Sequence, residues 1–231
     1  MKRFWKTAQT TTRDEGYGIE LDSRPVKLPS GAPLIVPFLP LADAITQEWA
    51  DAPQDFTPDD LPLTRLASTA QERVPPHRAE ITAQLASYGM NDLLCYRAEE
   101  PEALVARQDD IWGRWLRWAE ENYGLQLQST SGLLPINQSA STASTLHGIL
   151  SEQSNYSIAA LGVIIPALGS LLLGMAIATR AASLEDASQA AFLDELWQEE
   201  QWGADDEAVK RRAGLVADVT VSARFMALCG A

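Results

Sequence analysis

The first forty residues alternate hydrophobic and polar positions, which is the pattern of half-buried β-strands. Turn-forming residues at 22–24 and 29–31 interrupt the alternation. We therefore expect a small antiparallel meander whose strands lie at residues 17–21, 26–28 and 34–36, with residues 4–12 as a candidate further strand.

After Pro40 the hydrophobic spacing becomes helical. Helices are expected over residues 41–49, 78–88 and 101–124, and again from about residue 146 to the end, while residues 91–97 are expected to be extended and to join or cover the sheet. Strands followed by helices predict an α+β protein. We expect a small antiparallel β-rich N-terminal lobe over residues 1–55 and a mostly helical C-terminal lobe over residues 56–231.

An uncharged, apolar segment lies between Glu152 and Arg180 and has the length of a membrane span. Pro166 and three glycines interrupt it, and these residues weaken a continuous helix. We expect Pro166 to separate two buried helices, without membrane insertion. The alternative is a membrane-associated factor that uses residues 158–179.

Composition narrows the classes of function. The 31 acidic and 18 basic residues give a net charge of −13, which repels nucleic acid and anionic lipid. Cys95 and Cys229 both lie in apolar surroundings and predict buried, reduced thiols. His77 and His147 form no metal-binding motif, and no nucleotide-binding fingerprint or nucleophile elbow occurs. We expect a monomer without metal, cofactor or catalytic residue.

The segment from Ala181 to Val209 is strongly acidic, with nine Asp or Glu and no Lys or Arg. Ser183 and Asp186 have the spacing of a capping box and predict a helix that runs to Trp202, where Gly203 stops it. Asp205 or Asp206 is expected to cap a following helix over residues 207–225.

A helical wheel of this segment places Glu195 on the apolar arc of Leu184, Ala187, Ala191 and Phe192. The polar neighbours on the same side are Gln198, Glu199 and Trp202. A buried carboxylate requires a partner. Glu195 therefore pairs with a basic side chain inside the fold, or it faces a basic or amide group of another protein.

Two apolar residues, Leu193 and Trp197, fall on the polar side of this wheel. An exposed Trp beside carboxylates is typical of a contact surface. The candidate partner-binding residues are accordingly Glu195, Trp197, Gln198, Glu199, Trp202 and Asp205.

Several short motifs are spread along nearly the whole chain. They are FWK at 4–6, LDSRPVK at 21–27 with Pro29 and Gly31, EW at 48–49, LPLTRLA at 61–67, Tyr88 with DLLCYR at 92–97, RQ at 107–108 with Trp112, GSL at 169–171, and LDE at 193–195 with Gln198, Glu199, Trp202, Gly203 and Asp205. Through these motifs the chain resembles the family of assembly chaperones that bind the α subunit of the F-type ATP synthase catalytic head. The departures are mild, since Met is usual in place of Leu61 and Gly is commoner than Ser23.

The resemblance implies a protein that is not an enzyme, and that binds the unassembled α subunit and shields its contact surface until β subunits replace it. It also implies that the family's functionally important glutamate corresponds to Glu195. The family occurs in mitochondria and α-proteobacteria. Because residues 1–9 do not resemble an import leader, we expect a cytoplasmic bacterial member.

The competing function is a small carboxylate-dependent hydrolase that uses Glu195 with Asp205 or Asp92. Such an enzyme requires two carboxylates that converge in one pocket and differ in proton affinity. The positions of these three side chains decide between the two functions.

Overall fold

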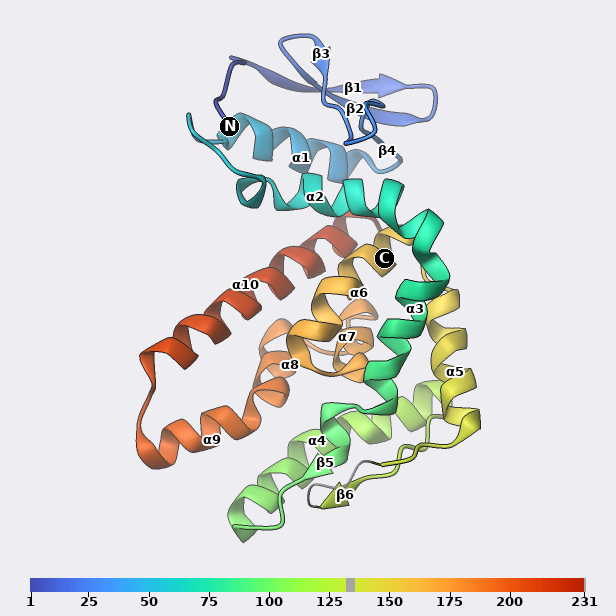
Figure 1. Ribbon diagram of the computed structural model, residues 1–231, viewed down its shortest axis with the longest axis vertical. Helices are drawn as coiled ribbons and strands as arrows, with labels where there is room; N and C mark the ends of the chain where they lie inside the picture. Colours follow the sequence, from blue (N-terminus) through green and yellow to red (C-terminus); the bar gives the residue numbers. More distant parts are fainter. Residues whose placement is uncertain (132–135, 231) are drawn as a thin grey trace. The chain divides into compact units, whose positions relative to one another are not determined.

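The computed structural model describes residues 1–131 and 136–230, and it confirms the α+β class: short strands near the start are followed by helices (Figure 1). The strands are β1 (Ala8–Arg13), β2 (Gly16–Leu21), β3 (Arg24–Pro25), β4 (Ile35–Val36), β5 (Tyr96–Arg97) and β6 (Thr130–Ser131). The α-helices are α1 (Leu39–Asp51), α2 (Pro62–Ser68), α3 (Val74–Met90), α4 (Glu102–Tyr123), α5 (Ala140–Ser151), α6 (Asn155–Leu168), α7 (Leu171–Ala178), α8 (Leu184–Ala191), α9 (Leu193–Trp202) and α10 (Asp206–Leu228). Shorter helical turns are η1 (Pro58–Asp60), η2 (Thr69–Arg73) and η3 (Leu93–Cys95).

The chain divides into two compact units. The first unit comprises Met1–Arg78, Ser154–Ala160 and Val221–Ala231, and the second comprises Ala79–Gln153 and Leu161–Thr220. The boundaries of these units differ from those of the predicted lobes at 1–55 and 56–231, because two segments from late in the sequence belong to the first unit. The division into a β-rich lobe and a helical lobe at residue 55 stays a prediction.

In the first unit, β2 is the central strand of an antiparallel sheet. It pairs with β1 along its whole length, with β3 at Glu20 and Leu21, and with β4 at Tyr17 and Gly18. Helix α1 packs on this sheet (Figure 1). The predicted strand at 4–12 begins later, at Ala8.

An aromatic cluster at one end of the first unit joins α1 to the chain on either side of it. Trp5 is buried and packs edge-on against Trp49 and Phe56 at ring distances of 5.1 and 5.4 Å. The Glu48 carboxylate accepts the backbone N–H groups of Leu63 and Thr64 at 2.7 and 3.0 Å, so it caps the start of α2. Burial raises the pKa of Glu48 above its ordinary value.

In the second unit, the core is built around α7, whose residues from Leu171 to Ile177 are all buried. The fully buried Asp92 carboxylate accepts the N–H groups of Leu94 at 3.2 Å and Leu172 at 3.1 Å, which ties η3 to the start of α7. Desolvation raises the pKa of Asp92 to about 6, although these hydrogen bonds oppose the shift.

Two expectations about this region were wrong. Pro166 lies inside α6 and does not separate two helices; the chain turns three residues later, where Gly169 has a φ of 65°, and the Ser170 hydroxyl caps α7 through the Leu173 N–H at 3.1 Å. Residues 96–97 do not join the N-terminal sheet, because they pair in parallel with β6. Residues 132–135, which lie between the helices expected at 101–124 and from about 146 onward, fall outside the described residues.

Both cysteines are free and buried, as predicted. Burial raises the pKa of each thiol to about 12. Within residues 1–131 and 136–230, no helix combines the length and the hydropathy that crossing a membrane requires.

Candidate functional site

The acidic segment forms two helices and not the single helix that the sequence predicted. Its start is as expected, because the Ser183 hydroxyl accepts the Asp186 N–H at 3.0 Å. The helix is then broken at Phe192, which has φ −106° and ψ 18°, and α9 begins at Leu193. The wheel drawn across both helices was therefore wrong for Leu193, which is buried and not on the polar side.

Two carboxylates of α9 face two arginines of α10. Glu195 lies 2.7 Å from Arg211 and 3.4 Å from Arg212, and Glu199 lies 2.6 Å from Arg212. The Arg212 side chain is only 13% exposed, whereas those of Glu195 and Arg211 are 36% and 52% exposed. The internal pairing required by the structural interpretation of Glu195 is therefore present, and one edge of the carboxylate pair is open to solvent.

Trp197 lies on another side of α9, toward α4. The Arg107 guanidinium lies over the Trp197 ring at 4.9 Å and also pairs with Glu200 at 2.8 Å. That ion pair raises the pKa of Arg107 and lowers the pKa of Glu200, so both groups stay charged at neutral pH. Trp197 is half-buried, so it is not the exposed aromatic residue that the sequence pattern suggested.

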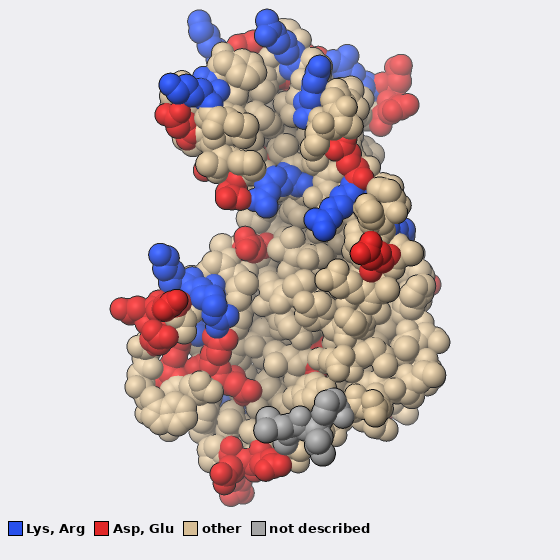
Figure 2. Space-filling view, in the orientation of Figure 1, with Lys and Arg blue, Asp and Glu red and all other residues tan. Residues whose placement is uncertain are grey.

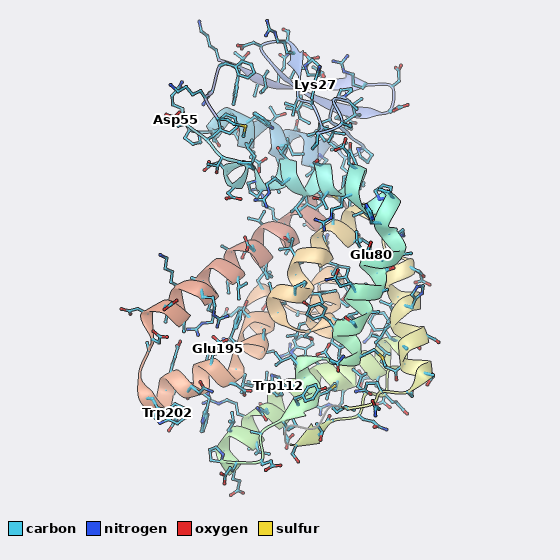
Figure 3. The ribbon with its side chains drawn as sticks, in the orientation of Figure 1. Lys27, Asp55, Glu80, Trp112, Glu195 and Trp202 are labelled. Carbon is cyan, nitrogen blue, oxygen red and sulfur yellow. The ribbon has the colours of Figure 1, made fainter. Side chains whose placement is uncertain are left out.

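The exposed aromatic residue is Trp202, the last residue of α9, which is 79% exposed. Gln198 is also exposed and precedes Trp202 by one helical turn, which places both on one side of α9. Asp205 follows the helix and caps α10, since its carboxylate accepts the Glu207 N–H at 3.2 Å. Figure 3 shows Glu195 directed toward α10 and Trp202 at the far end of α9.

The structure thus brings most of the predicted residues together on α9. Glu195 and Glu199 share Arg212, and Gln198 and Trp202 continue along the helix, whereas Trp197 faces α4. We name this region the α9 surface; it comprises the exposed Gln198, Trp202 and adjoining Asp205, together with the half-buried Glu195 and Glu199.

The net negative charge of the protein is concentrated in the second unit. That unit holds twenty Asp or Glu and eight Lys or Arg, whereas the first unit holds eleven and ten. Acidic side chains gather around α9 and the start of α10 (Figure 2). The α9 surface therefore combines a large exposed ring with an excess of carboxylates, which favours a basic and partly apolar partner.

Comparison with known proteins assigns the family. The family model of the ATP12 chaperone protein matches residues 2–120, which is more than half of the chain. The chain belongs to the ATP12 chaperone family. This family is the one that the sequence resembles, the assembly chaperones of the F-type ATP synthase.

Relatives of this ATP12-family chain extend the match beyond residue 120. The mitochondrial protein atp12 of Schizosaccharomyces pombe is 26% identical over 219 residues, which cover 90% of this chain and 75% of the relative. The crystal structure of Atp12 from Paracoccus denitrificans is 34% identical, with a TM-score of 0.93 over 98% of this chain and 97% of that one. A candidate chaperone of Agrobacterium tumefaciens matches with 33% identity and a TM-score of 0.92 over 97% of this chain and 85% of that one.

The carboxylates invoked for a hydrolase are held by different partners in this ATP12-family fold. Asp92 is enclosed at the start of α7, Glu195 is paired with arginines, and Asp205 caps α10. Two clefts of the described residues lie between α4 and α8 and on the N-terminal sheet, and none of these three carboxylates lines either of them. No group of three metal-ligating side chains occurs in the part of the chain that the structure describes.

Sequence reasoning missed the basic partners of the α9 surface. Arg211 and Arg212 follow the acidic segment directly, and the run Lys210–Arg212 is the first basic sequence after it. A long acidic stretch followed by a short basic one was the available signal for an ion-paired helical hairpin. Arg107 belonged to the family motif, but no feature of the sequence indicated that it contacts Trp197.

Proposed function

We propose that this chain binds the unassembled α subunit of the F-type ATP synthase and covers the surface that β subunits later contact. Membership of the ATP12 chaperone family supports the role in ATP synthase assembly. The choice of the α subunit rests on the family resemblance in the sequence. We propose that the chain acts as a cytoplasmic bacterial monomer, without membrane insertion, nucleic acid, metal or cofactor.

The observation that supports a contact role for α9 is the exposure of Trp202 beside carboxylates. Large aromatic residues dominate the binding energy of protein interfaces, because they bury much apolar area at a small entropic cost. A side chain that is 79% exposed contributes little to the stability of the isolated chain. The ring is therefore available to a partner, and the acidic rim selects a basic surface around it.

The arrangement of the polar groups supports binding over catalysis. Glu195 and Glu199 are paired with arginines of α10, and Asp205 caps α10. A hydrolase needs one carboxylate whose proton affinity differs strongly from that of its neighbour. The partner-binding residues we propose are Glu195, Gln198, Glu199, Trp202 and Asp205, with Trp197 as a flanking contact.

The test is a quantitative pull-down of purified α subunit with Trp202→Ala. Phe4→Ala is the matched control, because Phe4 is 70% exposed and lies in the first unit. We expect Trp202→Ala to weaken binding by about tenfold or more, as for an aromatic hot spot, while Phe4→Ala binds normally. Equal capture by both variants would exclude α9 as the contact site, and failure of the wild-type chain to bind would exclude the α subunit as its partner.

A further inference from the structure

The direction of α9 is set by the one-residue break between α8 and α9. Phe192 leaves the helical conformation, and both Phe192 and Leu193 are buried. Because α8 ends and α9 begins at this residue, the backbone conformation of Phe192 sets the direction of α9 relative to α8. Whatever holds this break also determines where the α9 surface points.

Trp112 of α4 holds the α8 side of the break. Its side chain is fully buried, and its indole N–H donates to the Ala190 carbonyl oxygen at 2.8 Å. In an uninterrupted helix, that carbonyl would accept the backbone N–H of Asp194. The indole therefore occupies an acceptor that a continuous helix would use.

Gln108, one turn earlier on α4, holds the α9 side. Its amide nitrogen donates to the Asp194 carboxylate at 2.7 Å, in the first turn of α9. Its amide oxygen accepts the Ala98 N–H at 2.8 Å, which fixes the orientation of the amide. Gln108 is fully buried and its partners Asp194 and Ala98 are half-buried, so losing either contact would leave a buried amide atom without a partner, which is costly.

Arg97 contacts both Gln108 and Trp112. Its guanidinium lies 5.1 Å from the centre of the Trp112 ring and donates to the Gln108 carbonyl oxygen. Gln108 and Trp112 are four residues apart and therefore share one face of α4. Together they contact the chain immediately before and after Phe192, and we name these two residues the α4 clamp.

We propose that the α4 clamp is a positioning device: Gln108 and Trp112 fix the angle of α9 and thereby aim the α9 surface at the partner. The inference rests on the proposed function of that surface, but it concerns residues that do not touch the partner. If the clamp served only core packing, its loss would lower the folded fraction and leave the affinity of each folded molecule unchanged.

The critical experiment reverses the hydrogen bond between Gln108 and Asp194. Gln108→Glu places two carboxylates in contact and breaks the bond, whereas Asp194→Asn leaves an amide pair that still bonds. In the double variant Gln108→Glu/Asp194→Asn, the new carboxylate accepts both the Ala98 N–H and the new amide N–H, and the net charge equals that of the wild type. Trp112→Phe provides an independent variant, since it removes the indole N–H and keeps an aromatic ring.

Each folded variant is measured for its affinity for the α subunit and for hydrogen exchange in α9 and α7. We expect Gln108→Glu to weaken binding by about tenfold and to speed exchange in α9 but not in α7, and the double variant to restore both. Trp112→Phe should change both readouts in the same direction as Gln108→Glu.

The inference would be overturned if folded Gln108→Glu and Trp112→Phe kept the wild-type affinity for the α subunit and the wild-type rate of hydrogen exchange in α9. It would also be overturned if the double variant failed to restore both quantities. If Trp202→Ala also binds normally, the proposed contact role of the α9 surface fails as well, whereas a defect in Trp202→Ala alone refutes only the clamp. If the wild-type chain does not bind the α subunit, α9 exchange still tests whether the clamp holds the helix.

Discussion

Reversing the charge at Glu195 separates its role in the fold from its role in binding. Glu195→Lys removes the pairs with Arg211 and Arg212 and places a third positive charge beside them. Glu195 and Arg211 are substantially exposed, at 36% and 52%, and such pairs contribute about 0–1 kcal/mol each. Arg212 is more enclosed, but it keeps Glu199 as a partner through two hydrogen bonds of 2.6 and 2.9 Å.

The expected cost in stability follows from this arrangement. Lost attraction and new repulsion together should lower the free energy of unfolding by about 1–2 kcal/mol, well below the ~3–5 kcal/mol of an uncompensated buried charge. For a chain of this size the melting temperature should fall by about 2–8 °C. The fold should therefore survive, and the main effect should be weaker binding of a basic partner surface, by about tenfold.

The assay combines thermal melting with a binding titration against purified α subunit. Glu121→Lys is the matched control, because it reverses the charge of an exposed acid of α4 in the same unit, away from α9. A variant that is unfolded at 25 °C would show that the Glu195 pairs are a structural necessity. A folded Glu195→Lys variant with wild-type affinity would refute a contact role for this glutamate.

Three further predictions concern stability and reactivity. Burial raises the pKa of Asp92 from 3.8 to about 6, so the folded state binds the proton more tightly than the unfolded state does. The contribution of Asp92 to stability is therefore largest below pH 4, and it falls by about 3 kcal/mol as the pH rises to 6. Asp92→Asn should remove this pH-dependent component from urea unfolding curves, and an unchanged pH profile would refute the prediction. Gly174→Ala places a methyl group 2.6 Å from Ile165 and should destabilise the fold by about 1–3 kcal/mol in urea denaturation. Gly162→Ala meets nothing within 4 Å and should stabilise the fold by about 0.5–1 kcal/mol. Equal effects of the two variants would contradict the packing between α6 and α7. Because burial raises the thiol pKa values to about 12, Cys95 and Cys229 should resist a thiol reagent at pH 8 in the native protein and react after denaturation, and rapid reaction of the native protein would contradict their burial.

The elements that the sequence predicted well are those whose signals are local. The Ser183 cap and the end of α9 before Gly203 depend on residues within one or two turns, and both occur where they were expected. The strands expected at 17–21 and 34–36 were likewise readable, because alternation and turn residues lie within forty residues, whereas the strand expected at 26–28 lies at Arg24–Pro25 instead. Periodicity also predicted α1 and α4 within about two residues at most ends.

The features that were misjudged depend on residues distant in sequence. The Trp112 indole bonds to Ala190, which is 78 residues away in sequence and lies two residues before the break at Phe192, so no wheel of the acidic segment reveals this contact. Pro166 was taken as the end of a helix, yet Gly169 and the Ser170 cap end it, and both signals were present in the sequence. The pairing of Glu195 with α10 also needed the fold, because the helical hairpin brings Arg211 back to the acidic helix.

The central claim is that this chain holds the α subunit before it meets β subunits, and the most direct test is a competition experiment with purified components. The chain is mixed with isolated α subunit, isolated β subunit or the assembled catalytic head, and the complexes are separated by size-exclusion chromatography. We predict a stoichiometric complex with the α subunit alone, and its displacement when β subunits are added. Binding to the assembled head, equal binding to β, or no complex with the α subunit would contradict the account.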